Sequence, residues 1–341
     1  MSLMLLDVAI ILVKIVIVIG ALMLTIAYLI LAERKVAGFI QERHGPNRVG
    51  PFGLLQPIAD GIKTLLKEDI TPARADSLIH TLAPAMVLAP ALMTFSVIPF
   101  GTGIEAFGRH IKFQVVDINI GILLIFAITS IGVYGVVLGG WSSNNKYSLL
   151  GGLRSSAQMI SYEIALGLSV IGIILITGSL RLNDIVDSQL GMWNIVKQPL
   201  AFIVFITAIF AETNRLPFDL AEAEQELVAG YHTEYSGFKY SMFMMGEYSN
   251  VITASALIVT LFFGGWDVPF VDEAALGGLG AFISVLSFAF KTAFFLFLYL
   301  WVRWTLPRFR YDQLMHLGWK VLLPLALLNL ILTAAWITYV R

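Results

Sequence analysis

The feature that most constrains this chain is a series of apolar runs that are long enough to cross a lipid bilayer. A transmembrane helix needs about 20 mostly apolar residues. Only 13% of the chain is charged, whereas soluble domains have about 25%. The sequence therefore predicts an all-α polytopic membrane protein, a single membrane domain over residues 1–341. It has about eight transmembrane helices, the fifth of them short, near residues 8–32, 78–99, 117–139, 156–178, 198–213, 242–264, 281–304 and 321–340.

The distribution of Lys and Arg predicts which loops face the cytoplasm. The first, third, fifth and seventh loops hold Arg34, Lys35, Arg43, Arg48, Lys63, Lys67, Arg74, Lys146, Arg154, Arg215, Lys239, Arg303, Arg308, Arg310 and Lys320. The alternate loops hold only Arg109, Lys112, Arg181 and Lys197. We therefore expect both termini on the periplasmic side, with the first apolar run retained as a span because it is too long for a signal peptide.

The first cytoplasmic loop, 33–77, is predicted to contain an amphipathic helix. In LLQPIADGIKTLLKE, the apolar residues fall on one face at 100° per residue, and Asp60, Lys63 and Lys67 fall on the other. Pro57 fits the first turn, where its missing N–H costs little. Such a helix suits the membrane interface, and a surface helix that covers a soluble partner is the alternative.

The residue types present exclude several kinds of chemistry for the chain itself. There is no Cys, so disulfides, thiolate catalysis and Cys-ligated iron–sulfur clusters are excluded. The five His show no HExxH spacing, and no GxxxxGK[ST] loop is present. No basic patch points to nucleic acid. We therefore expect no metal site and no covalently bound cofactor.

A second cytoplasmic loop, 212–241, is strongly acidic, with no Lys or Arg between Arg215 and Lys239. Asp219 and Glu222 have the spacing of a capping box, which would account for two of the acids. In a helix from 220 to about 229, Glu222 and Glu226 would repel each other at i and i+4. Burial would raise carboxylate pKa values and allow a proton path, whereas a site for a hard cation is the competing interpretation.

Two carboxylates are predicted inside spans, where each is costly unless it is paired or hydrated. Glu163 lies in SAQMISYEIALG of the fourth span, and Glu247 lies in FMMGEYSN at the start of the sixth. A structural hydrogen bond between helices is the plain explanation for either residue. A proton or substrate path is the functional one, because intramembrane carboxylates usually mark such paths.

Several long strings together resemble one family over essentially the whole chain. They are ERKVAGFIQERHGPNRVGPFGLLQPIADGIKTLLKE, SYEIALG, AETNRLPFDLAEAEQELVAGYHTEYSG, MGEYSN and LPRFRYDQLMHLGWK. They are similar to the membrane subunit of respiratory complex I, the proton-pumping NADH:quinone oxidoreductase, whose mitochondrial form is NADH dehydrogenase subunit 1. The resemblance implies a membrane protein that carries no redox centre and forms much of a ubiquinone chamber. Flavin and iron–sulfur clusters would belong to partner subunits of the hydrophilic arm.

The resemblance also implies site residues, partners and a location. Its quinone-chamber residues are Glu33, Arg34, Lys35, Arg43, Asp60, Lys63, Arg303 and Arg308, and its proton path is Glu163, Glu212, Asp219, Glu222, Glu224, Glu226, Glu234 and Glu247. The partners would be hydrophilic-arm quinone-site and iron–sulfur subunits, small membrane subunits, antiporter-like subunits and lipid. The bacterial inner membrane is expected, with the mitochondrial inner membrane as the alternative. Other functions that fit are the anchor of an ion-pumping hydrogenase or formate complex and a free-standing secondary transporter.

Overall fold

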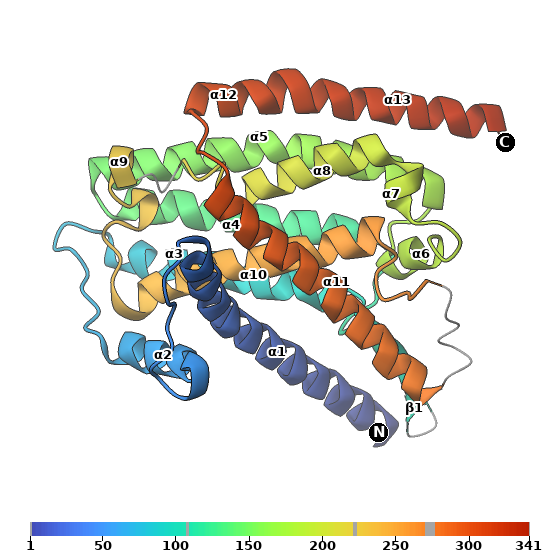
Figure 1. Ribbon diagram of the computed structural model, residues 1–341, viewed down its shortest axis with the longest axis horizontal. Coiled ribbons are helices and arrows are strands. Elements are labelled where there is room, and N and C mark those ends of the chain that lie inside the picture. The colour runs from blue at the N-terminus through green and yellow to red at the C-terminus, as the bar shows by residue number, and fades with distance from the viewer. Residues whose placement is uncertain (1, 107–108, 221–223, 270–276, 341) are drawn as a thin grey trace.

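The computed structural model describes residues 2–106, 109–220, 224–269 and 277–340, and its backbone is a bundle of long helices (Figure 1). Within these residues, seven helical segments are long and apolar enough to span a membrane, which confirms the predicted fold class. They are α1 (Ser2–Ile40), α3 (Ser77–Thr94) with its 3₁₀ turn η2 (Phe95–Val97), α4 (Gly121–Ser142), α5 (Lys146–Thr177), α10 (Gly237–Phe262), α11 (Gly278–Thr305), and the last span, which consists of α12 (Tyr311–His316), the π-helical η5 (Leu317–Leu322) and α13 (Leu323–Val340).

The expected short fifth span is α8 (Pro199–Glu212), an apolar helix of 14 residues. This is below the roughly 20 residues that cross a bilayer alone. The remaining elements are η1 (Pro51–Gly53), α2 (Gln56–Leu66), β1 (Gly101–Ala106), β2 (Arg109–Phe113), α6 (Leu182–Asp187), α7 (Asn194–Lys197), α9 (Glu224–Leu227) and η3 (Gly230–His232). The antiparallel pair β1–β2 and the short helices α6 and α7 were not predicted from the sequence.

The two ends of the bundle carry different loops (Figure 1). One end, called here the α2 end, holds α2, α9 and α12. The opposite end holds β1, α6 and α7, together with the beginning of α1 and the end of α13. The 33–77 loop and the acidic loop therefore lie at one end and both termini lie at the other, as the charge distribution predicts for their relative placement.

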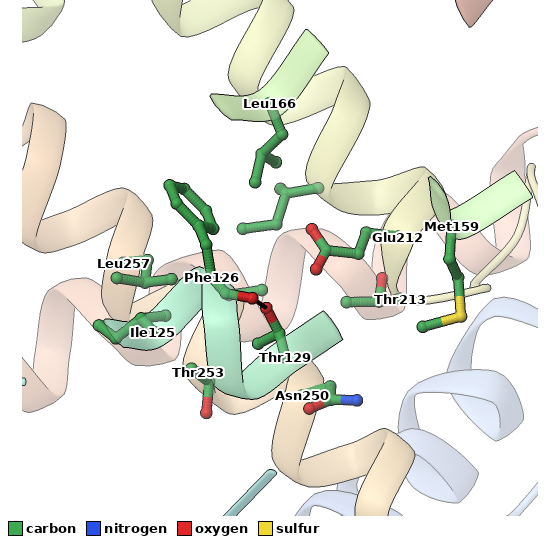
Figure 2. Close-up of a pocket in the computed structure, with 12 residues that line it drawn as sticks. Ile125, Phe126, Thr129, Met159, Leu166, Glu212, Thr213, Asn250, Thr253 and Leu257 are labelled. Atoms are coloured by element: carbon green, nitrogen blue, oxygen red, sulfur yellow. Dashed lines mark hydrogen bonds between the residues drawn. The ribbon is translucent and has the colours of Figure 1, made fainter. Parts of the chain in front are cut away.

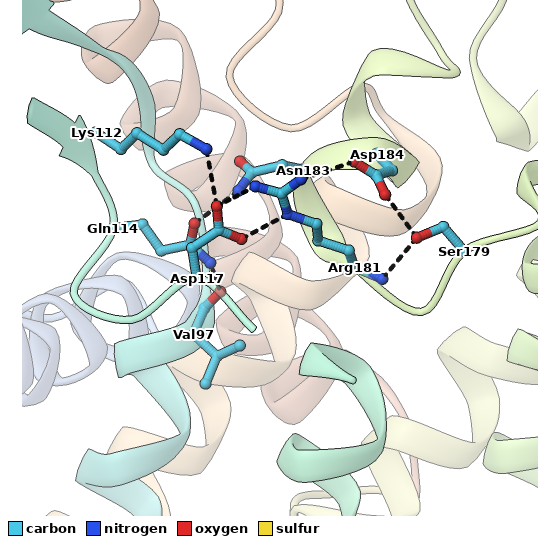
Figure 3. A network of polar contacts seen from close by, with 8 residues as sticks. All are labelled: Val97, Lys112, Gln114, Asp117, Ser179, Arg181, Asn183 and Asp184. Atoms are coloured by element: carbon cyan, nitrogen blue, oxygen red, sulfur yellow. Dashed lines mark hydrogen bonds and ion pairs between the residues drawn. The ribbon is translucent and has the colours of Figure 1, made fainter. Parts of the chain in front are cut away.

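At the end opposite α2, an ionic network joins the hairpin to α6 (Figure 3). Arg181 Nε donates to Asp117 Oδ1 at 2.7 Å, and Lys112 Nζ donates to Asp117 Oδ2 at 2.8 Å. The hydrogen bonds from Arg181, more than any other contact, hold the pKa of Asp117 well below its usual range. Lys14 of α1 donates to the Gln114 carbonyl oxygen at 3.1 Å, so α1 is tied to the same loop.

The core lies around α10, which is the most enclosed span. In its most apolar stretch 78% of the residues are buried, against 11% in α1 and 22% in the last span. The main apolar core combines side chains of α5, α8 and α10, and Phe205 and Phe262 pack at 5.3 Å between ring centres. Polar residues on α10 therefore lie in a buried, low-dielectric interior, whereas α1 and the last span present apolar faces outward.

Two helix boundaries differ from those predicted. α1 continues to Ile40 instead of ending near residue 32, so Glu33, Arg34 and Lys35 all lie on the helix. The helix predicted from 220 to about 229 was wrong in its end, because α9 stops at Leu227, where Val228 takes a left-handed conformation (φ 65°) that no helix continues. Leu220, where the helix was expected to start, is not helical, and residues 221–223, including Glu222 of the predicted capping box, lie outside the described residues. Pro57 lies in the first turn of α2, as predicted.

Candidate functional site

An ion pair joins α1 to α11 at the α2 end of the bundle. The Oε1 atom of Glu33 pairs with Arg303, and its Oε2 atom accepts a hydrogen bond of 2.6 Å from the Tyr248 hydroxyl of α10. Glu33 is only 7% exposed. Because a buried carboxylate is costly without partners, Arg303 and Tyr248 are what allow the charge to remain there.

Arg215 extends this pair into a chain of contacts. Its guanidinium lies over the ring of Tyr248, 4.3 Å from the ring centre, and its Nη2 atom lies 3.9 Å from Glu247 Oε2. Glu247 in turn accepts a hydrogen bond of 2.5 Å from the Tyr231 hydroxyl. Arg303, Glu33, Tyr248, Arg215 and Glu247 form what we call the ionic cluster, in which charges of both signs alternate along a series of contacts.

Arg215 owes its position to the way α8 ends. Asn214 adopts a left-handed conformation (φ 49°), which terminates the helix and turns the chain. The buried Gln158 of α5 then holds this turn, because its Nε2 donates to the carbonyl oxygens of Ala211 (2.7 Å) and Phe218 (2.8 Å) and to Asn214 Oδ1 (3.0 Å). We call this arrangement the Gln158 clamp. It fixes the segment that carries both Arg215 and Asp219.

A small cavity lies against the ionic cluster. Its polar side is Glu33, Arg215, Tyr248 and Arg303, together with Tyr299, and its apolar side includes Leu296. Its volume is about 10 Å³, which is room for about one water molecule. We call it the cluster cavity. Apolar and charged walls therefore meet at the α2 end, between α1, α10 and α11.

A second ion pair at this end joins Asp219 to Arg308, with 3.1 Å between Oδ2 and Nη2. The backbone N–H of Phe309 donates to the Pro217 carbonyl oxygen at 3.1 Å, so the segment after α11 is held along the 215–220 turn. Burial raises the pKa of Asp219 to about 6, although Arg308 opposes the shift. This carboxyl therefore changes its charge close to physiological pH.

A larger cavity lies beside Glu212, where α8 ends (Figure 2). Thr129 of α4 and Thr213, Asn250 and Thr253 add polar groups to its otherwise apolar lining. The volume is about 30 Å³, enough for about two water molecules. We call it the Glu212 cavity. Glu163 lies close enough to Glu212 to act on it electrostatically, and it accepts a hydrogen bond from Ser130, next to Thr129.

The other residues expected at a quinone chamber connect α1 to the α2 region instead. Arg34 Nη1 lies 2.7 Å from Asp60 Oδ2, and Lys63 lies 3.5 Å from Asp60 Oδ1. Burial would raise the pKa of Asp60, but the hydrogen bond from Gln56 and the nearby cations leave it below its usual value. Lys35 donates to the carbonyl oxygen of Phe52 at 2.5 Å, and Arg43 donates to Gln41 at 2.7 Å. The structure therefore brings Glu33 and Arg303 together and leaves these side chains outside the ionic cluster.

The carboxylates of the acidic loop have partners from other elements. Glu226 pairs with Arg154 of α5 at 2.6 Å, and Glu234 accepts a hydrogen bond of 2.6 Å from Asn145. Glu224 is the first residue of α9, and Glu222 lies outside the described residues. The bases that the loop lacks are thus supplied by α5 and by Arg308. In the described part of the chain, no group of three or more His, Asp or Glu could hold a metal ion.

Sequence reasoning missed Arg215, Tyr248 and Gln158 as site residues. Arg215 was counted only as one of the loop charges, and Tyr248 stood unnoticed beside Glu247 in GEYSN. The sequence did contain a signal for Arg215, because this cation comes two residues after the predicted fifth span, 198–213, which is short for a helix that crosses a bilayer. Gln158 gives no such signal, because its role depends on a turn more than 50 residues away, at 211–218.

Fold and site together define a multi-pass membrane protein with a buried ionic cluster at one end of its helices, the kind of arrangement expected of a protein that handles charge next to lipid. The family model described as NADH dehydrogenase matches residues 13–334. The chain belongs to this family of membrane subunits.

Curated relatives match it over nearly their full length. It is 54% identical over 333 residues to NADH-quinone oxidoreductase subunit 8 of Rhodothermus marinus, with 93% of this chain and 94% of the relative covered. It is 53% identical over 336 residues to an H-type NADH-quinone oxidoreductase subunit of Geobacter metallireducens, with 98% of each chain covered. The family match over residues 13–334 spans the part of the chain that carries the ionic cluster, and together with these relatives it makes this chain a complex I membrane subunit.

Proposed function

We propose that this chain forms the membrane part of a ubiquinone chamber in NADH-quinone oxidoreductase and couples quinone reduction to proton translocation. The observation that carries the proposal is the ionic cluster, in which Arg303, Glu33, Tyr248, Arg215 and Glu247 contact one another in that order at the α2 end. Relatives named as quinone oxidoreductase subunits support it.

The chemistry of quinone reduction explains why apolar walls and charges should meet. The isoprenoid tail of ubiquinone is soluble in lipid, and its head takes up two electrons and two protons on reduction. Leu29, Val251 and Leu296 give the cluster cavity apolar sides, while Glu33 and Arg303 supply charge. In a poorly screened interior, a change of charge at the head acts strongly on such neighbours. The exposed apolar face of α2, with Leu65 and Leu66, suits the lipid interface where the tail would arrive.

Coupling to protons would use the carboxylates that lie next to the cluster. Glu247 is part of the cluster itself, Asp219 lies on the turn held by the Gln158 clamp, and Glu212 and Glu163 lie at the Glu212 cavity. We include Glu222, Glu224, Glu226 and Glu234 in the proposed path on the family resemblance. A change of charge at Glu33 or Arg303 would act on Glu247 through Tyr248 and Arg215, because these groups contact one another in that order.

The partners and the membrane are also part of the proposal. Hydrophilic-arm subunits with flavin and iron–sulfur clusters would dock at the α2 end, where Arg34, Lys63 and Arg310 are exposed. Small membrane subunits and antiporter-like subunits would cover the apolar flanks. We place the chain in a bacterial inner membrane with both termini in the periplasm, or in the mitochondrial inner membrane. The hydrogenase-type anchor and the free-standing transporter are less favoured, since the relatives are named for NADH and quinone.

The experiment is quinone reduction by the purified complex carrying Glu33→Gln or Arg303→Met in this chain. Either substitution leaves the other charge of the pair without its partner and free to shift, and a displacement of about 1 Å at a reacting site can cost about 10²-fold in rate, so we expect quinone reduction to fall at least about tenfold. Electron transfer from NADH to a water-soluble artificial acceptor should stay unchanged, because that acceptor needs no chamber. Arg109→Gln is the matched control, since Arg109 pairs with Asp7 at the opposite end. Normal quinone reduction by both cluster variants in an assembled complex would refute the proposal.

A further inference from the structure

The hydroxyl of Tyr299 stands out among the buried polar groups of the described residues. Tyr299 lies on α11 and is 4% exposed, yet among the described residues its hydroxyl has no well-formed hydrogen bond and only a loose contact with the Thr213 side chain. The ring stacks on Phe210, with 3.8 Å between ring centres and 12° between planes. A Phe would provide this packing equally well, without a buried hydroxyl that costs free energy when it is unpaired. The hydroxyl therefore calls for an explanation that the packing does not give.

The position of Tyr299 supplies an explanation for its hydroxyl, because the residue lies between the two cavities. Its side chain lines the cluster cavity together with Glu33, Arg215 and Arg303. Its polar neighbours on the other side are Thr213 and Glu212, which line the Glu212 cavity. The two cavities also flank the same turn of α10, since Val251 lines the first and Asn250 lines the second.

Thr213 is suited to receive a hydrogen bond from this hydroxyl. The Thr213 Oγ1 atom donates its own hydrogen to the Phe210 carbonyl oxygen at 3.1 Å. Its lone pairs are therefore free to accept. The Tyr299 hydroxyl is within reach of the Thr213 hydroxyl and close enough to Glu212 to feel its charge, and the same tyrosine side chain lines the cluster cavity.

From this geometry we infer that Tyr299 is a proton relay between the cluster cavity and the Glu212 cavity. In one transfer, a hydrated proton in the cluster cavity protonates the tyrosine oxygen, and the tyrosine passes its own hydrogen to the Thr213 oxygen. The Thr213 hydroxyl turns from the Phe210 carbonyl oxygen and passes its hydrogen to Glu212 once that carboxyl has given up its proton to the rest of the path. The oxygen of Tyr299 gains one O–H bond and loses one, so the residue ends neutral, and water and a protonated Glu212 remain. The reverse transfer follows the same atoms. This inference rests on the proposed function, whose proton path it connects to the quinone side.

The test is proton translocation by the complex in liposomes with Tyr299→Phe, which removes only the hydroxyl. Positioned proton-transfer groups contribute about 10²-fold or more to a rate, so we expect the number of protons moved per quinone reduced to fall severalfold. The KM for quinone should stay unchanged, because the Phe ring keeps the stack on Phe210. Thr213→Val should give the same loss. Tyr235→Phe is the matched control, since the Tyr235 hydroxyl lies near Ser142 (3.4 Å), outside both cavities.

The outcomes separate the relay from the proposed function. If Glu212→Gln abolishes pumping while Tyr299→Phe pumps normally, the relay is refuted and the proposed proton path stands. If both variants pump normally, both are refuted. Should Tyr299→Phe fail to assemble, 3-fluorotyrosine at this position keeps the shape and lowers the phenol pKa. A pH profile of pumping that moves with fluorination supports the relay, and an unmoved profile overturns it.

Discussion

Replacing Gln158 with Leu should loosen the turn that presents Arg215 and Asp219 while leaving the spans in place. The substitution removes three hydrogen bonds, to the carbonyl oxygens of Ala211 and Phe218 and to Asn214 Oδ1. Each is worth about 1 kcal/mol net. Both carbonyl oxygens keep a second donor, the backbone N–H groups of Asn214 and Leu220, so among these three acceptors only the buried Asn214 Oδ1 is left without a donor from a described residue. We therefore expect the turn to lose about 2–3 kcal/mol.

Hydrogen exchange measures this loss directly. A change of 1.4 kcal/mol is about tenfold in an opening equilibrium, so amides of residues 213–220 should exchange about 30- to 150-fold faster in Gln158→Leu. Quinone reduction should fall together with protection, because a displacement of about 1 Å at a reacting site can cost about 10²-fold. Gln158→Glu should be more severe, since it sets carboxylate oxygens against two carbonyl oxygens.

Gln198→Leu is the matched control. Gln198 is another buried glutamine, bonded to Thr333 (2.7 Å) and Asn329 (2.9 Å) between α8 and α13. Its loss should leave the exchange of residues 213–220 unchanged. If these residues keep wild-type protection in Gln158→Leu, the turn is held by something other than the clamp, and our account of how Arg215 is positioned is wrong.

Three further substitutions test other parts of the site. Burial raises the pKa of Asp219 to about 6, so the protonated carboxyl contributes to stability at low pH, and this contribution is lost as pH rises through 6. Asp219→Asn should therefore remove a titration near pH 6 from the pH profile of quinone reduction. A Cβ on Gly151 would come within 2.6 Å of Gly230 Cα, so Gly151→Ala should displace the segment after α9 and lower the yield of assembled complex, which native gel electrophoresis would show. Arg154→Gln breaks an exposed pair with Glu226 and should change thermal stability by no more than about 1 kcal/mol, an effect that added salt should mimic.

The spans could be predicted from the sequence because apolar length is a local property. The same holds for α2, whose apolar and charged faces are visible within 11 residues. The site was only partly predictable. Glu33 and Arg303 were expected at a chamber through the family resemblance, but their pairing depends on α1 and α11 meeting at one end, which no local pattern encodes. The hairpin of β1 and β2 was missed because its six- and five-residue strands lie beside a span in a chain dominated by helical runs.

The acidic loop also shows that a local sequence pattern does not reveal which distant residues will pair. Its lack of Lys and Arg suggested carboxylates that repel one another, and the helix expected there would have placed two of them on one face. In the structure, Glu226 pairs with Arg154, which is 72 residues earlier in the chain, and Asp219 pairs with Arg308, which is 89 residues later. Charge balance within a segment says little when neighbouring helices bring the counterions. Only a three-dimensional contact map would have supplied these pairs.

The pairing of Glu33 with Arg303 also bears on how the chain is made. The two residues are 270 positions apart. During translation, Glu33 is therefore synthesised, and α1 can be inserted into the membrane, long before Arg303 has been made. During that interval the carboxylate has to stay at the lipid–water boundary or carry a proton. The cluster closes only when α11 has been inserted beside α1. A truncated or wrongly threaded chain would keep an uncompensated acid near lipid, a defect that membrane quality control can detect.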